Sequence, residues 1–336
     1  MSEEITYLDA ARMAVADEMR LDPNVWCLGE DLGRGGVFGQ YAGLAEEFGP
    51  SRVADTPISE AAIVGAAVGA ALVGTRPIVE MRFADFALCA VDELVNQAAK
   101  NRFMFGGQGR VPIVVRQPSG MWRSSAAQHS QSLEAWYAHV PGLVVVCPST
   151  PADNYGLLRA SIRCDDPVVY MEHKGLWQTT APTFDRTESA ALGKARLVRD
   201  GNDLTIVSWS AALHIAETAA DDLKSQSGIS SELIDLRTIY PWDREAVLAS
   251  AQRTGHLLVV HEAVATGGFG AEIAASAAEE IGVRVGRVGL PRVPVPYAQS
   301  LENLIKLTPE RVIDAAHRLL GAGREVGSAT PNSKLN

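Results

Sequence analysis

Short runs rich in Val, Ile and Leu alternate with helical stretches along most of the chain, and this alternation constrains the fold more than any other feature. Runs of this kind fit parallel strands that are covered by helices on both faces. In the first half we expect strands over 25–28, 77–81, 111–116, 143–147 and 168–172. The helices expected around them begin at Thr6 and then cover 60–73, 85–102, 133–139 and 152–163. The pattern predicts an α/β fold.

The same alternation resumes after residue 200, and 336 residues are enough for two domains. We expect the first domain over 4–175 and a linker without periodicity over 176–200. The second domain is expected over 201–320, and the Gly- and Ser-rich residues 321–336 predict a loose tail. Its expected strands are 204–208, 232–236, 257–261 and 283–288, with helices over 211–224, 244–251 and 269–281.

Composition excludes several classes of function. The net charge of −10 is spread along the chain without a basic block, which argues against nucleic acid as a partner. The longest uncharged apolar run, 61–74, is shorter than the about 20 residues that span a bilayer. The first four residues are acidic, so no signal or transit peptide is visible. The four cysteines lie far apart without a CxxC pair, which favours reduced thiols in the bacterial cytoplasm over metal ligands.

A carboxylate stands at the start of the most apolar of the expected helices. Ser59 can cap this helix, and Glu60 lies in its first turn, where the helix dipole favours negative charge. Gly65 and Gly69 allow another backbone to pack closely against the helix. A buried acid in such surroundings is costly unless a partner or ligand binds it. Glu60 is therefore either a capping residue with satisfied hydrogen bonds or a reagent.

Other candidate positions lie in loops. His129 stands in a polar loop between a strand and a helix, where α/β sheets bind ligands, and it is either a proton-transfer group or a hydrogen-bonded loop residue. Phe86 is either a core residue or a face on which a flat ring stacks. The glycine-rich segment 29–36 contains Glu30 and Asp31, so a shaped loop is favoured over a phosphate cradle. Residues 267–270 fit a tight strand-to-helix connection.

Taken together, these segments resemble the β subunits of the thiamine-diphosphate-dependent 2-oxoacid dehydrogenases, most closely the pyruvate dehydrogenase type. The matching strings include Asp-Thr-Pro-Ile-Ser-Glu at 55–60, Phe-Ala-Asp-Phe at 83–86 and Ala-Ala-Gln-His-Ser-Gln-Ser at 126–132. The second half adds the strings at 235–243 and 260–263. The resemblance implies a transketolase-like pyrimidine-binding domain followed by a transketolase C-terminal-type domain.

The resemblance also implies an α2β2 heterotetramer in which thiamine diphosphate lies between unlike subunits. The α-type partner carries the Gly-Asp-Gly…Asn signature that holds the diphosphate through Mg²⁺, and this chain has no such signature. A complete active site in this chain alone is therefore not expected.

By the same resemblance, each site residue receives a role. Glu60 hydrogen-bonds the N1′ atom of the aminopyrimidine and favours the tautomer that removes the C2 proton. Ile58 and Phe86 line the pyrimidine pocket, and His129 transfers a proton in decarboxylation or in acylation of the lipoyl group. Some members hold a potassium ion, largely through backbone carbonyls, at positions that match Ile113, Ser161, Ile162, Cys164 and Asp166. Cys164 and Asp166 differ from the acidic residue and the asparagine usual in the family.

The implied reaction decarboxylates pyruvate and reductively acylates the lipoyl group of a dihydrolipoyl acyltransferase. Acetoin and branched-chain 2-oxoacids are alternatives, because residues 132–137 look like pyruvate members whereas 171–174 also fit acetoin dehydrogenases. A self-sufficient enzyme similar to transketolase or deoxyxylulose-phosphate synthase is disfavoured by the missing diphosphate signature. A non-catalytic α/β scaffold is disfavoured because Glu60, Phe86 and His129 are all retained.

Overall fold

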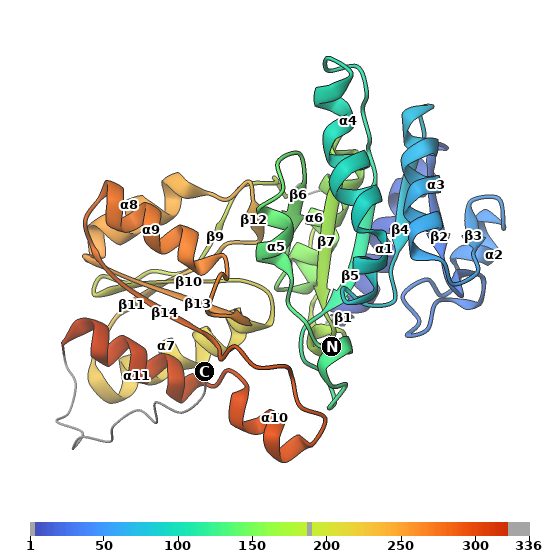
Figure 1. The fold of residues 1–336 in the computed structure, drawn as a ribbon. Helices are drawn as coiled ribbons and strands as arrows, with labels where there is room; N and C mark the ends of the chain where they lie inside the picture. Colours follow the sequence, from blue (N-terminus) through green and yellow to red (C-terminus); the bar gives the residue numbers. More distant parts are fainter. Residues whose placement is uncertain (1–3, 187–189, 322–336) are drawn as a thin grey trace.

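The computed structural model describes residues 4–186 and 190–321, which form two domains side by side (Figure 1). One domain is built on a seven-stranded sheet and the other on a five-stranded sheet, so the expected α/β fold is confirmed. Apart from Gly321, which ends the last helix, the predicted tail lies outside the described residues. No helix in the described ranges has the length and apolar character needed to cross a membrane.

The seven-stranded sheet is parallel except at one edge. There β12 pairs antiparallel with β6, although β12 belongs to the second half of the chain. In spatial order the strands are β12 (Thr238–Tyr240), β6 (Val144–Val146), β7 (Val168–His173), β5 (Val114–Ser119), β4 (Arg76–Glu80), β2 (Val25–Gly29) and β3 (Val53–Asp55). Sequence analysis missed β3 and β12, because three residues are too few to show a periodic pattern.

Helices cover both faces of this sheet, which explains the continuous apolar runs. Ile78 and Val114 face one side, whereas the next residues, Val79 and Val115, face the other, as the period of a strand requires. The first side packs against α1 (Tyr7–Leu21) and α6 (Pro151–Arg163). The second side packs against α3 (Glu60–Leu72), η2 (Phe86–Ala90), η3 (Glu93–Ala98), α4 (Ala99–Met104) and α5 (Glu134–Ala138). The short helix α2 (Leu44–Phe48) lies in the loop before β3.

Of the two helix caps expected from the sequence, one is formed and the other is not. Thr6 caps α1 by accepting a hydrogen bond from the amide of Asp9 at 3.0 Å. Ser59 occupies the N-cap position of α3, but its side chain makes no capping hydrogen bond.

The single helix expected over 85–102 is instead wound in succession as a 3₁₀ helix, a π helix and an α helix. Apolar spacing does not separate these windings, because 3.0 and 3.6 residues per turn differ by only about half a residue.

The five-stranded sheet carries helices on both faces as well. Its strands, in spatial order, are β14 (Arg284–Leu290), β13 (His256–Val264), β10 (Leu204–Ser208), β11 (Ser231–Asp235) and β9 (Arg196–Arg199), of which β9 is antiparallel. Its helices are α7 (Ala211–Ser227), α8 (Arg244–Thr254), α9 (Gly270–Glu280) and α11 (Pro309–Leu320). A further helix, α10 (Gln299–Ile305), lies at the bottom of Figure 1, away from the sheet.

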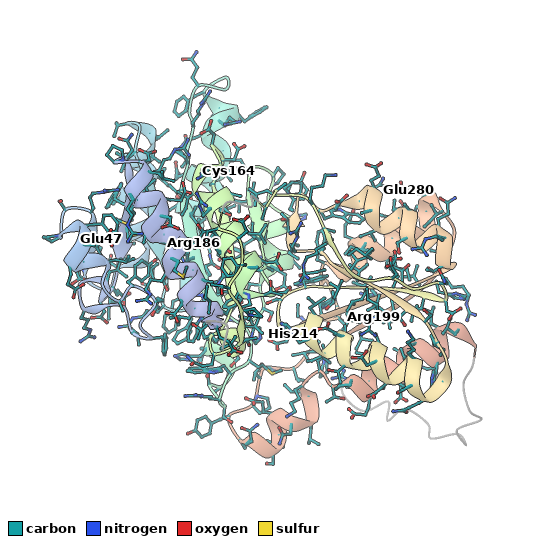
Figure 2. The ribbon with its side chains drawn as sticks, turned by 180° about the vertical axis from the view of Figure 1, so that it is seen from behind. Glu47, Cys164, Arg186, Arg199, His214 and Glu280 are labelled. Carbon is teal, nitrogen blue, oxygen red and sulfur yellow. The ribbon has the colours of Figure 1, made fainter. Side chains whose placement is uncertain are left out.

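The segment expected as a linker contains two strands. β8 (Thr180–Pro182) pairs with β1 (Glu4–Thr6), and β9 joins the second sheet. Both pairings join segments that are distant in sequence, so local patterns do not reveal them. The contact between the domains, called the seam below, is part of one hydrophobic cluster that includes Val79, Trp209 and Val247. On the rear view, His214 lies at the seam (Figure 2), where its Nε2 atom is 2.8 Å from the carbonyl oxygen of Ser149.

Candidate active site

The candidate site residues follow strands at one edge of the first sheet, called the carboxyl edge here. Strands β3, β2, β4, β5 and β7 are parallel, so their carboxyl ends lie together. Glu60 follows β3, Phe86 follows β4 and His129 follows β5. Neighbouring strands lie about 4.8 Å apart, which puts the ends of β3 and β5 about 14 Å apart. Ligands of α/β proteins bind at such edges.

Glu60 is half-buried at the first position of α3. Within residues 4–186 and 190–321, no hydrogen bond or ion pair reaches its carboxylate, so it is not a capping residue with satisfied hydrogen bonds. Ile58, two residues earlier, is 77% exposed. The positive end of the helix dipole lies at this place. The structure therefore leaves this acid available to a ligand.

Helix α3 and the end of α4 expose apolar residues. Along α3 the exposed residues Ala62, Ala66 and Gly69 recur at helical spacing, and Val73 just after the helix is 82% exposed. Where α4 ends, three consecutive apolar residues are exposed: Phe103 is 85% exposed, Met104 72% and Phe105 56%. In Figure 1, α3 and α4 extend in the same direction from the sheet. Contiguous exposed apolar residues are typical of surfaces that contact another protein.

His129 lies against two phenylalanine rings. Its ring centroid is 5.0 Å from that of Phe83 and 5.2 Å from that of Phe86, and the two phenylalanine rings are 5.4 Å apart. All three pairs meet edge to face, the geometry that the ring quadrupoles favour. The structure thus brings His129 and Phe86 together, while Glu60 lies farther along the carboxyl edge, on α3, which packs against η2.

The loop that carries His129 (residues 120–132, called the His129 loop) is held by groups that follow β4 and β7. Gln131 donates through Nε2 to Oδ1 of Asp85 at 2.8 Å. The ammonium of Lys174 donates to the carbonyl oxygen of His129 and lies 4.7 Å from the centre of the Phe83 ring. Lys174 is only 1% exposed, and burial lowers the pKa of its ammonium to about 8. These contacts fix the histidine from its backbone side.

Sequence analysis assigned no role to Lys174, His173 or Glu262, although they take part in the same network. His173 ends β7, and its Nε2 atom contacts the carboxylate of Glu262, which is contributed by β13 of the second domain. The available signal was position, because His173 and Lys174 stand where a parallel strand ends at the carboxyl edge. Glu262 gives no such signal, since it reaches the site only through the seam.

The two glycine-rich segments have structural explanations. In the segment 29–36, Arg82 pairs with Glu30 at 3.1 Å and also with Asp31, so both acids are engaged within the loop. In the segment 267–270, a Cβ atom on Gly268 or Gly270 would lie 2.7 or 2.8 Å from ring carbons of His261. These glycines are required by close packing against that ring.

The carbonyl groups expected to hold potassium already accept hydrogen bonds. The guanidinium of Arg76 donates to the carbonyl oxygens of Ile162 and Cys164 at 3.1 and 3.0 Å. The carbonyl oxygen of Ile113 accepts from the amide of Val168 at 2.9 Å. Cys164 is labelled in Figure 2, on the first domain. A guanidinium thus already contacts two of these acceptors, and potassium stays a prediction.

The two remaining residues of that set have their own partners. The hydroxyl of Ser161 donates to the carbonyl oxygen of Leu157 at 2.7 Å, within α6. Asp166 pairs with Arg102 at 2.9 Å. Across the part of the chain that the structure describes, no group of three or more His, Cys, Asp or Glu side chains could hold a metal ion.

Comparisons with known proteins agree with this architecture. Residues 3–179 match the family described as transketolase, pyrimidine binding domain, and residues 193–312 match the family described as transketolase, C-terminal domain. A solved structure of an inactive β4 tetramer of a split-gene transketolase superimposes with a TM-score of 0.79, covering 95% of this chain and 99% of that chain. Its sequence is 23% identical, so this likeness concerns the fold.

Three curated relatives have different substrates in their names. The 2-oxoisovalerate dehydrogenase subunit beta of Bacillus subtilis is 42% identical over 94% of this chain and 98% of its own length. The pyruvate dehydrogenase E1 component subunit beta-2 of Oryza sativa is 41% identical over 94% of this chain and 86% of its own length. The acetoin:2,6-dichlorophenolindophenol oxidoreductase subunit beta of Cupriavidus necator is 40% identical, with 96% and 100% covered.

Proposed function

The chain belongs to the family of E1 β subunits of the 2-oxoacid dehydrogenases, and from this premise we propose that it supplies one half of a thiamine diphosphate site. With an α-type partner, the enzyme decarboxylates pyruvate and reductively acylates the lipoyl group of a dihydrolipoyl acyltransferase. The observation that carries the proposal is the unpartnered carboxylate of Glu60, which lies on the same carboxyl edge as His129.

The residues present fit the pyrimidine half of the cofactor. When bound, thiamine diphosphate supplies the carbon atom that adds to the 2-oxo group and takes up the electron pair released with carbon dioxide. Glu60 accepts a hydrogen bond from the pyrimidine nitrogen and holds the proton there. A charge-assisted bond of this kind contributes about 1.5–3 kcal/mol.

The other side chains bind the ring and move a proton. The half-buried ring of Phe86 offers a face to the flat pyrimidine, and the exposed side chain of Ile58 covers it from the neighbouring segment. An imidazole can both accept and donate a proton, which suits His129 to proton transfer to the reacting group. Lys174 and Asp85 hold the loop that carries this imidazole.

An α-type partner completes the site in this proposal. The exposed apolar residues of α3 and of 103–105 supply the surface for such a partner, which would hold the diphosphate through Mg²⁺ in an α2β2 assembly. The structural neighbour that contains β chains alone is described as inactive, which supports a site that needs both subunits. The four cysteines are unpaired, as in reducing compartments, which supports a location in the bacterial cytoplasm.

Reconstitution tests the proposal. The purified chain is assayed with thiamine diphosphate and Mg²⁺, alone and with an α-type partner, for dye-linked oxidation of pyruvate, 2-oxoisovalerate and acetoin. We expect turnover only in the presence of the partner, with the highest kcat/KM for pyruvate. Turnover by the chain alone would contradict the half-site, and a higher kcat/KM for either other compound would reassign the substrate.

A further inference from the structure

A carboxylate from the second domain contacts both ends of the His129 loop. Glu262 lies in β13, and its Oε1 atom accepts a hydrogen bond from the amide of Met121 at 2.8 Å. The same oxygen accepts from the hydroxyl of Ser132 at 3.3 Å. Met121 stands near the start of the loop and Ser132 at its end. One side chain therefore fixes the two points where the loop leaves and rejoins the first domain.

His173 completes the contact and fixes the charge of Glu262. The Nδ1 atom of His173 accepts a hydrogen bond from the amide of Gly175 at 3.0 Å, so the ring proton lies on Nε2. Nε2 lies 3.0 and 3.1 Å from the two oxygens of Glu262 and donates to them. In the described part of the chain, the groups that hydrogen-bond this carboxylate are thus all donors. Burial raises the pKa of Glu262, but His173 and the other donors outweigh burial and lower it.

Gly120 shows how closely this pair packs against the start of the loop. Its φ is +81°, and a Cβ atom there would lie 2.1 Å from Nε2 of His173 and 2.8 Å from Oε1 of Glu262. Only a residue without a side chain fits both the conformation and the space.

The backbone of the His129 loop needs such external support. Arg123, Ser124 and Ala126 have φ values of 49°, 54° and 63°, in the left-handed region that side chains disfavour. Residues in such conformations persist only where the surroundings hold them, and they concentrate at functional sites. Ser124 also contacts the second domain, through a hydrogen bond of 2.8 Å to Gln299 near the start of α10. The second domain thus touches the loop at both its ends and at its tip.

We propose that Glu262 is a positioning residue, through which the second domain sets the conformation of the His129 loop and hence the place of the imidazole at the carboxyl edge. The role assigned to His129 rests on the proposed function, whereas the positioning of the loop does not. Glu262 therefore acts on catalysis through His129 alone and not through contact with the substrate.

The variant Glu262→Gln removes this arrangement with little change in volume. If the amide oxygen of the new glutamine takes the place of Oε1, the NH₂ group of the same side chain faces the Nε2–H group of His173, so that two donors meet. The ring cannot avoid this by moving its proton to Nδ1, because that atom faces the amide of Gly175. Ser132→Ala, a milder variant, removes one donor and leaves the others. Ser149→Ala is the matched control, since Ser149 bonds Asp235 across the seam at 2.9 Å without touching the loop.

The first measurement is hydrogen exchange of peptides over 120–132 in the full chain. We expect exchange to accelerate about tenfold in Glu262→Gln, by less in Ser132→Ala and not at all in Ser149→Ala. Equal acceleration in Ser149→Ala would show that any weakening of the seam loosens the loop. Unchanged exchange in Glu262→Gln would overturn the proposal. Neither outcome depends on enzymatic activity, so the proposed function can fail separately.

The second measurement is a double-mutant cycle in the reconstituted enzyme, with lipoyl acylation as the readout. We expect Glu262→Gln to lower kcat about tenfold with KM for the 2-oxoacid nearly unchanged, and to have no further effect in a His129→Ala background. Additive losses would show that Glu262 acts by another route and would overturn its positioning role. If His129→Ala itself leaves acylation unchanged, the proposed function of His129 fails while the exchange result stands.

Discussion

The two ends of the carboxyl edge differ in what holds them. The His129 loop is fixed from within the chain by Asp85, Lys174 and Glu262. Glu60 follows β3 at the other end, and no described residue hydrogen-bonds its carboxylate; α3 and residues 103–105 also expose apolar side chains. One end is thus preorganised by this chain, whereas the other is the end that, in our proposal, cofactor and partner complete.

The largest effect is expected at the open end. Glu60→Gln should lower C2 proton exchange of thiamine diphosphate in the reconstituted enzyme by about 10²–10⁴-fold, because the amide does not hold the pyrimidine proton as a carboxylate does. The melting midpoint should stay within about 1 °C, since no partner within the chain is lost. Proton exchange followed by NMR and a thermal melt check both statements. Glu46→Gln is the control, because Glu46 is also an acid near a helix start but is exposed on α2, away from α3. Unchanged exchange would remove Glu60 from catalysis.

At the closed end, His129→Ala should lower acylation of the lipoyl group by about 10²-fold. The imidazole is replaced without loss of the backbone contact, because Lys174 bonds the carbonyl oxygen of residue 129 and not its side chain. Lipoyl acylation is measured by mass spectrometry with wild-type protein as reference. Normal acylation would leave His129 as a loop residue.

Lys174→Met tests the support of the histidine and should lower kcat by up to about tenfold, through a small displacement of the loop.

The same variant should also change how the free energy of unfolding depends on pH. In the folded chain the pKa of Lys174 falls from 10.5 to about 8, so between these values the unfolded state binds more protons and the stability of the native state rises with pH. The destabilisation that results from burying the charged ammonium is fully present below pH 8. Subtracting the denaturation free energies of the variant from those of wild type should reveal this rise between pH 8 and 10.5. A flat difference would show that the buried ammonium carries no penalty.

The smallest effect is expected for potassium. Replacing Na⁺ by K⁺ at equal ionic strength should move the melting midpoint by less than about 1 °C, since Arg76 already occupies the acceptors of Ile162 and Cys164. Arg76→Gln is the informative variant, because it frees these carbonyls. A rise of several degrees with K⁺ in the unchanged chain would show that the ion displaces the guanidinium.

Local sequence patterns were sufficient to predict the strands that consist of continuous apolar runs. The runs that became β2, β4, β7 and β10 were predicted because burial on both faces requires continuous apolar residues. They were not sufficient for β8, β9 and β12, whose partners lie far away in the sequence. The single helix expected over 85–102 was wrong in its winding, although helical segments cover most of this range.

The candidate site divides in the same way. Glu60, Phe86 and His129 were named from strings that resemble a family, and their catalytic roles stay predictions. Lys174 and Glu262 received no role from the sequence, because their contacts join residues 45 to 141 positions apart. Spacing along the chain carries no information about such pairs.

By itself, the sequence determined the alternation of strands and helices and the identity of the groups that can carry charge or protons. Only the tertiary structure decided which of two similar acids is engaged. Glu60 and Glu262 both lie in apolar stretches. Glu262, from the second domain, is hydrogen-bonded by donors of the first domain, whereas Glu60 meets no donor among the described residues. The physical reason is that a hydrogen bond depends on atoms within about 3 Å, and folding alone brings distant segments that close.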